Sequence, residues 1–292
     1  MPVTTSTSLG DTLPKFIAEA RLTLSQVGAA KAAMQTMPLG KKQGLTLNIP
    51  TWTQPTAYTL TEGVDMAQAQ QITDANVAIT VAENAGVQVI FSRLAMDSIR
   101  EDAIRMAARA MANAVENKRG DDLVTLFSGF GTTLGSAGTT LGLGHVMAGK
   151  VRLLTAARPI EGEIAAVLHP YMLHGMYEDF LAMASGAFGT ASPNAGSQVA
   201  EDIIRKYDVF DVAGVKVYSD PLITADGSDD GIGAIFARNA LIYVPYEEES
   251  IEEDPDSSLR AVEVNMVATY GYGEYQDTWG FGMTFDRATP AG

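Results

Sequence analysis

The segment from Ile49 to Gln68, IPTWTQPTAYTLTEGVDMAQ, limits the fold more than any other part of the chain. Its threonines and aromatic residues favour extended backbone, yet it contains Pro50 and Pro55. Proline has no N–H to donate and is confined to edge strands and bulges. Because an isolated two-stranded ribbon is marginally stable in water, we expect a long arm that is stabilised by lying on another chain.

The residues on both sides of this segment predict strands. Leu45, Leu47 and Ile49 alternate with polar residues, which is the pattern of a half-buried strand. Downstream, residues 76–82 and 87–92 are rich in β-branched residues. The intervening sequence Glu83–Gly86 predicts a hairpin turn between these two runs.

A long helix is predicted from Ser98 to about Gly120. The sequence SIREDAIRMAARAMANAVENKRG has no proline or internal glycine and is dense in good helix formers. Ser98 and Glu101 form a candidate capping box, and Gly120 is a candidate stop. The expected apolar stripe consists of Ile99, Ala103, Met106, Ala110 and Ala114.

The second half predicts a compact α/β or α+β unit. A glycine-rich stretch, Ser128–Gly144, predicts a loop with a domain boundary near residue 135. Helices are then expected over 144–157 and 171–184, and strands over 164–170, 209–220, 231–246, 259–275 and 279–285. The acidic run Glu247–Asp256 is interpreted as a solvated loop, with a cation site or a contact for a basic neighbour as the alternatives.

No motif for catalysis, a cofactor or a metal is found in the sequence. There is no cysteine, no GxxxxGK[ST], no GxSxG and no HExxH. His169 and His174 are five residues apart, so they do not share a helical face as zinc ligands do. The loop that begins at Asp226 resembles a calcium loop, but its twelfth residue is Ala237 where glutamate is required. We therefore expect no enzyme activity, no cofactor and no metal.

Charge and hydropathy exclude further classes. No run approaches the roughly 20 apolar residues that span a bilayer, and the N-terminus lacks the pattern of a signal peptide. The net charge of −15 argues against extensive binding of nucleic acid. Residues 1–60 nevertheless carry +3, which predicts a basic arm for an acidic partner or enclosed nucleic acid. Its basic residues are Lys15, Arg21, Lys31, Lys41 and Lys42.

The order of these features resembles the major capsid protein of tailed bacteriophages, whose fold is named after phage Hong Kong 97. The resemblance runs from about residue 10 to 286. It rests on GLTLNIPTWTQPTAYTLTEGVD and the strands after it, on the helix IREDAIRMAARAMANAVENKRGDDLVTLFSG, and on VAGVKVYSDPL with the closing strands. It implies an α+β fold with an N-terminal arm, an extended loop, a peripheral domain with a long spine helix, and an axial domain.

The resemblance also implies how the chain is divided. Residues 1–43 would form the N-terminal arm and 44–76 the extended loop. The peripheral domain would take 77–135 and 245–278, and the axial domain 136–244, while 279–292 would complete the sheet of either domain.

The extended loop would then contact a neighbouring subunit through Trp52, Tyr58, Leu60, Glu62, Val64 and Asp65. On sign alone, Glu62 and Asp65 would pair with Arg100, Arg105 or Arg109 of the neighbour's spine helix.

The implied function is a structural one. The chain would assemble into hexamers and pentamers of an icosahedral shell around double-stranded DNA, without sequence-specific binding, within a virion built in the host cytoplasm. A portal, a separate scaffolding protein or none, and a cement protein would be its partners. No lysine lies between Lys42 and Lys118, so a covalent crosslink from the loop is not expected. The alternatives are an encapsulin-type compartment shell and a cytosolic α/β enzyme that uses the His169–Asp179 region.

Overall fold

The computed structural model describes residues 28–52, 55–63, 65–66, 69–93, 101–155, 160, 162–184 and 211–290; within these, the side chains of 83, 101–106, 181–184, 248–249 and 253 are not described. The helices are α3 (Ala30–Ala33), α5 (Glu101–Thr125), α6 (Leu143–Leu154) and α7 (Pro170–Ala184), with short 3-10 turns η1 (Leu126–Ser128), η2 (Arg238–Ala240) and η3 (Asp277–Trp279). The strands are β1 (Gln35–Thr36), β2 (Thr46–Trp52), β3 (Asp74–Thr80), β4 (Ala82–Ser92), β5 (Thr133–Gly135), β6 (Ile164–Leu168), β7 (Asp211–Val212), β8 (Val215–Ser219), β9 (Asp230–Ala237), β10 (Leu241–Asp256), β11 (Ala261–Glu274) and β12 (Gly280–Asp286).

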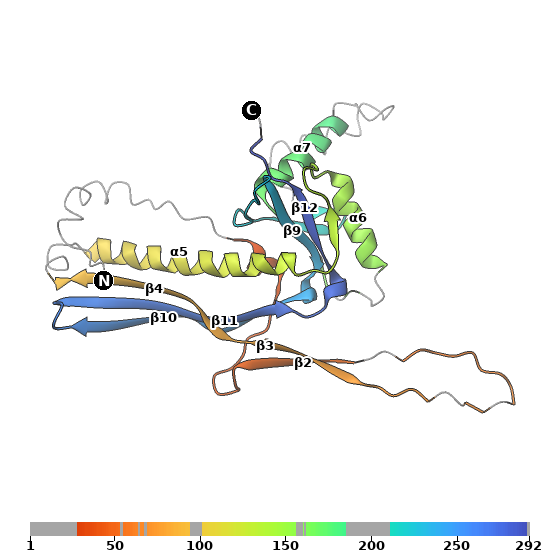
Figure 1. Ribbon diagram of the computed structural model, residues 1–292, viewed down its shortest axis with the longest axis horizontal. Coiled ribbons are helices and arrows are strands. Elements are labelled where there is room, and N and C mark those ends of the chain that lie inside the picture. The colour runs from red at the N-terminus through yellow and green to blue at the C-terminus, as the bar shows by residue number, and fades with distance from the viewer. Residues whose placement is uncertain are drawn as a thin grey trace.

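These strands form three sheets. A four-stranded sheet has the order β1-β10-β11-β4, a six-stranded sheet has the order β5-β12-β9-β6-β8-β7, and β2 pairs with β3 alone. Figure 1 shows α5 lying along the four-stranded sheet, α6 and α7 beside the six-stranded sheet, and the β2–β3 ribbon extending away from both. The predicted α+β class is confirmed.

The buried apolar side chains form three clusters, one of which is shared by the two large sheets. The largest apolar cluster takes Phe236 from β9 of the six-stranded sheet and Tyr243 and Tyr270 from the four-stranded sheet, together with Val115 of α5. A second cluster lies between the other face of the six-stranded sheet and helices α6 and α7. A third, around Ile79 and Val244, holds the base of the β2–β3 ribbon. The first cluster therefore joins the two large sheets.

The predicted hairpin at Glu83–Gly86 is wrong. These residues lie inside β4, where Gly86 is opposite Val267 of β11, and Gly86 does not have the positive φ that a tight hairpin turn favours. β3 pairs with β2 instead. The long-range partner β11 offers a continuous ladder, which a local turn signal cannot reveal.

The long helix is confirmed, but two of its details differ. Gly120 does not end α5, which continues to Thr125. It is buried, and a Cβ there would collide with the side chain of Leu222 and lie 3.7 Å from the Cα of Gly28. Ala110 and Ala114 are exposed, whereas Met111 and Val115 face the core. The candidate capping residue Ser98 is outside the described residues.

The acidic run is also not a loop. Glu247–Asp256 is the second half of β10, paired with β11 from Ser250↔Val267 to Asp256↔Ala261. β1 pairs only with Ile242 and Tyr243, so this half of β10 is an edge among the described strands. Charged side chains are common on edge strands, where they hinder pairing with other chains. The edge position of this half of β10 is therefore compatible with so acidic a sequence.

Candidate intersubunit surfaces

The ribbon is built as a regular antiparallel pair that continues into an open loop. The register runs from Thr46↔Thr80 to Trp52↔Asp74. Beyond the last pair, the Gln70 side chain takes the place of a strand neighbour. Its Nε2 donates to the Thr56 carbonyl at 2.6 Å and its Oε1 accepts from the Thr56 N–H at 2.8 Å. The two sides of the loop are thus held together without ladder bonds.

Apolar side chains on this loop are exposed in the single chain. Trp52 is 65% exposed, Tyr58 50% and Leu60 65%. Two further residues that the sequence analysis did not select, Met66 and Ile72, are also exposed. The alternation of apolar and polar residues that includes Leu60 and Val64 continues to Met66, and this signal could have identified Met66.

The charged residues expected on the loop and on the spine helix are only partly described. Glu62 and Asp65 are exposed, while Val64 lies outside the described residues. Arg109 is exposed on α5, and for Arg105 only the backbone position in α5 is given; Arg100 lies outside. The loop points away from α5 in Figure 1, so one chain does not bring these groups together.

The described residues of the basic arm lie against β10. Lys41 Nζ pairs with Glu247 Oε1 at 3.0 Å, and Lys31 Nζ lies 5.3 Å from the ring centre of Tyr243. Lys42 is exposed and has a positive φ, whereas Lys15 and Arg21 are outside the described residues. Part of the positive charge near the N-terminus therefore faces the acidic strand of its own chain.

The described side chains of the acidic strand show no metal site. Among the described residues no group of three or more His, Asp or Glu side chains could hold a metal ion. Asp256 ends β10, and its Oδ1 accepts hydrogen bonds from the N–H and hydroxyl of Ser258 and the N–H of Leu259. These bonds lower the pKa of Asp256, with the Ser258 hydroxyl contributing most.

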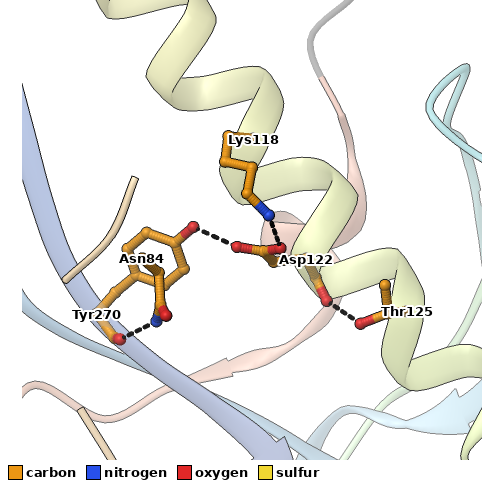
Figure 2. A network of polar contacts seen from close by, with 5 residues as sticks. All are labelled: Asn84, Lys118, Asp122, Thr125 and Tyr270. Atoms are coloured by element: carbon orange, nitrogen blue, oxygen red, sulfur yellow. Dashed lines mark hydrogen bonds and ion pairs between the residues drawn. The ribbon is translucent and has the colours of Figure 1, made fainter. Parts of the chain in front are cut away.

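A buried polar network fastens α5 to the four-stranded sheet. Figure 2 shows Asp122 between Lys118 and Tyr270: Asp122 Oδ2 accepts from the Tyr270 hydroxyl at 2.7 Å, and Oδ1 pairs with Lys118. Asn84 Nδ2 donates to the Tyr270 carbonyl at 2.6 Å. Buried polar groups of this kind stabilise a fold only when they are paired. The residues come from three distant segments, so sequence spacing gave no sign of the network.

A second buried charge lies in the same helix. The side chain of Arg119 is 1% exposed and pairs with Glu116 on the preceding turn. Its guanidinium carbon lies 5.5 Å from the ring centre of Tyr270. Arginine stacks on aromatic faces more readily than lysine, so α5 and β11 are joined by charge as well as by apolar packing.

In the His169–Asp179 region, which the enzyme alternative would use, polar side chains accept hydrogen bonds from backbone N–H groups at the starts of helices. His169 Nδ1 accepts from the Tyr171 N–H at 3.1 Å, and Asp179 Oδ2 accepts from the Leu143 N–H at 2.8 Å. Burial, with a smaller effect from Arg287, lowers the pKa of His169 to about 4. His169 is therefore neutral near pH 7 and is oriented by backbone contacts. His174 lies 3.7 Å from Glu178 on the helix surface.

Two carboxyl groups meet where the chain passes from β11 to β12. Asp277 Oδ1 accepts from the Gly131 N–H at 2.6 Å, and a hydrogen bond joins its carboxyl group to that of Glu274. Two carboxyl groups can share a hydrogen bond only if one is protonated. Burial, the charge of Asp277 and this bond raise the pKa of Glu274 to about 7.

This pair predicts a pH dependence of stability. Because the folded state holds the Glu274 proton more tightly than the unfolded state, the stabilisation is complete below about pH 4.5 and is lost as the pH rises to about 7. We expect Glu274→Gln to remove this decline, since glutamine donates a hydrogen bond at every pH. Urea unfolding at pH 5 and pH 8 measures the change in the free energy of unfolding. The exposed Glu252→Gln is the control, and an equal pH slope in wild type and Glu274→Gln would contradict the prediction.

Neither a protein-family model nor a curated protein sequence matches this chain significantly. Solved structures do. A chain from Mycobacterium phage Che8 has a TM-score of 0.69 at 13% identity, covering 91% of this chain and 93% of its own. The head structure of Helicobacter pylori bacteriophage KHP40 has a TM-score of 0.68 at 10% identity, over 87% and 88%. The capsid structure of Cyanophage P-SCSP1u has 0.64 at 11%, over 90% and 90%.

These similarities extend over nearly the whole chain. The chain therefore has the fold seen in phage head and capsid structures, with an extended ribbon, a long helix on a four-stranded sheet and a six-stranded sheet beside it. The resemblance inferred from the order of sequence features is confirmed for the fold. In addition, no helix among the described residues is long and apolar enough to cross a membrane.

Proposed function

We propose that this protein is the major capsid protein of a tailed phage and assembles into an icosahedral shell that encloses double-stranded DNA. The observation that carries the proposal is the exposed apolar loop on a fold shared with phage capsid structures. Trp52, Tyr58 and Leu60 are each at least half exposed, and apolar side chains gathered on an arm mark an interaction surface. Such an arm suits assembly with other chains, which supports a structural function.

We extend the proposal to the domains of the chain. The N-terminal arm would be 1–43, the extended loop 44–76, the peripheral domain 77–135 with 245–278, and the axial domain 136–244. The pairing of β10, β11 and β4 supports the grouping of two distant segments in the peripheral domain. The pairing of β12 with β9 supports assigning 279–292 to the axial domain.

The same proposal assigns the contacts of the loop. Trp52, Tyr58, Leu60 and Val64 would bury their apolar surface on a neighbour. Glu62 and Asp65 would face the basic side of its spine helix, which carries Arg100, Arg105 and Arg109. The exposure of Arg109 and of both acids supports this pairing. Contacts between exposed charges contribute little affinity and mainly orient the partners.

The proposal also includes the oligomers that the subunits form and the other proteins of the virion. The subunits would form hexamers and pentamers, with a portal, a cement protein and a separate scaffolding protein or none, in a virion assembled in the host cytoplasm. The net charge of −15 supports a shell that encloses DNA without gripping it. The absence of lysine between Lys42 and Lys118 supports a shell that is not covalently crosslinked through the loop.

Electron microscopy of the purified full-length protein tests the proposal. We expect closed shells of uniform size, made of hexamers and pentamers. Monomers or dimers alone at every protein concentration would contradict it and favour the enzyme alternative. Shells that form around a co-expressed cargo enzyme, with no portal in the gene neighbourhood, would favour the encapsulin alternative.

A further inference from the structure

Helix α6 has apolar side chains on more than its buried face. Leu143, Val146 and Leu153 are buried against the six-stranded sheet. On the adjoining face, Met147 is 45% exposed, Val151 60% and Leu154 64%. The spacing of four and then three residues places these three on one face of the helix. We call this face, made of Met147, Val151 and Leu154, the α6 stripe.

The α6 stripe lies on the outside of the molecule. Its helix covers one face of the six-stranded sheet, whereas the other face packs in the cluster shared with α5. Figure 1 shows α6 at the side of the sheet away from the body of α5 and the four-stranded sheet. None of the described elements covers the stripe, since its residues remain exposed.

The charge around the stripe is unlike that of the rest of the chain. The sequence of α6, LGHVMAGKVRLL, contains Lys150 and Arg152 and no acid, while the whole chain carries −15. Lys150 Nζ donates to the carbonyl of Ala213, and Arg152 is exposed about 100° around the helix from Val151. A surface that matches this face is apolar with acidic groups at its rim, and a second copy of this acidic chain is rich in such groups.

The size of the stripe also favours a second copy over a separate soluble partner. Three side chains are far fewer than the roughly 20–30 residues on each side of an interface that is stable alone. Such a contact contributes only where other contacts already hold the two partners together. Neighbouring copies held by the extended loop meet this condition, so the argument rests on the proposed function.

We propose that the α6 stripe docks on a different surface of an adjacent copy of the same chain. A two-fold contact of one stripe with another would join only two copies, whereas the proposed hexamers and pentamers are rings. A contact between unlike surfaces repeats around a ring when its rotation closes. The stripe is thus a second assembly contact that acts together with the loop.

A point substitution at the centre of the stripe tests its role in assembly. We expect Val151→Asp to fold with an unchanged melting temperature, because the site is largely exposed, and to reduce the yield of shells at least tenfold. Val151→Ile retains an apolar side chain and serves as the matched control, with a normal yield. Normal shell yield from Val151→Asp would overturn the proposal.

Crosslinking identifies the partner, since the chain has no cysteine of its own. The Val151→Cys variant, labelled with a photoreactive maleimide in assembled shells, is expected to crosslink to a peptide of another copy outside α6. The proposal would be overturned if the label crosslinked only to a different protein. It would also be overturned if the unlabelled Val151→Cys variant formed disulfide-linked dimers on oxidation. If wild type forms no shells, both this inference and the proposed function fail; if only the Val151 results are negative, the proposed function stands.

Discussion

Replacing residues 53–73 with a two-residue Asn-Gly turn is expected to give a folded subunit that forms no shells. Trp52 and Asp74 are the last pair of the ribbon, so a short turn can close it there. None of the three apolar clusters includes a described residue of the removed segment. We therefore expect the melting temperature to change little while particles disappear in electron microscopy and light scattering.

The size of the effect follows from the apolar side chains on the loop. Full burial of each large apolar side chain contributes ~1.5–3 kcal/mol, and a loss of about 4 kcal/mol weakens a contact about 1000-fold. A triple substitution of Trp52, Tyr58 and Leu60 by serine is expected to have the same result as the replacement. Thr59→Ser with Thr61→Ser is the control on the same loop. Shells of normal yield from the triple variant would refute the assignment of the loop as the main contact.

Phe236→Ala is expected to destabilise the subunit by about 3–5 kcal/mol, because it leaves a large cavity in the core. Phe236 is fully buried, and its ring centre lies 5.9 Å from that of Phe127 and 6.2 Å from that of Phe130. These rings belong to the cluster that joins the two large sheets. Both sheets should therefore unfold together in one transition at lower urea concentration.

The measurement is urea unfolding by circular dichroism and tryptophan fluorescence, on the loop-replaced subunit so that assembly does not interfere. Ile232→Ala, on the same strand but 39% exposed, is expected to cost less than about 1.5 kcal/mol. A loss below about 1 kcal/mol for Phe236→Ala, or two separate transitions by the two probes, would show that the cluster does not join the sheets as described.

Local patterns predicted most elements of this fold. The helix over 171–184 and the strand over 164–170 lie where the sequence indicates them, because their apolar patterns act over a few positions. The predictions that Gly120 ends a helix and that Gly86 lies in a turn are wrong for the same reason. In α5 and β4, a glycine that normally ends or turns an element is accommodated by partners distant in the sequence.

The sequence predicts the apolar loop as a candidate surface but not the α6 stripe. The apolar loop was visible in the sequence because its prolines and exposed Trp52 contradict a central strand. The α6 stripe was not recognised, since the sequence LGHVMAGKVRLL does not show which apolar face is covered. The Asp122 network and the Glu274–Asp277 pair depend on contacts across the fold, and no spacing rule reports them.

The connections between the two large sheets have a mechanical consequence. The chain passes between them near η1, η2 and η3, and hydrogen bonds tie these passages together: Tyr275 N–H to the Ala240 carbonyl at 2.8 Å, and Gly131 N–H to Asp277 at 2.6 Å. The 25 residues of α5 extend from this point as a rigid rod of about 38 Å. A rotation of about 10° between the two sheets at this point would move the far end of the rod by roughly 7 Å, so a small adjustment within the shared cluster becomes a large displacement at the rim of the subunit.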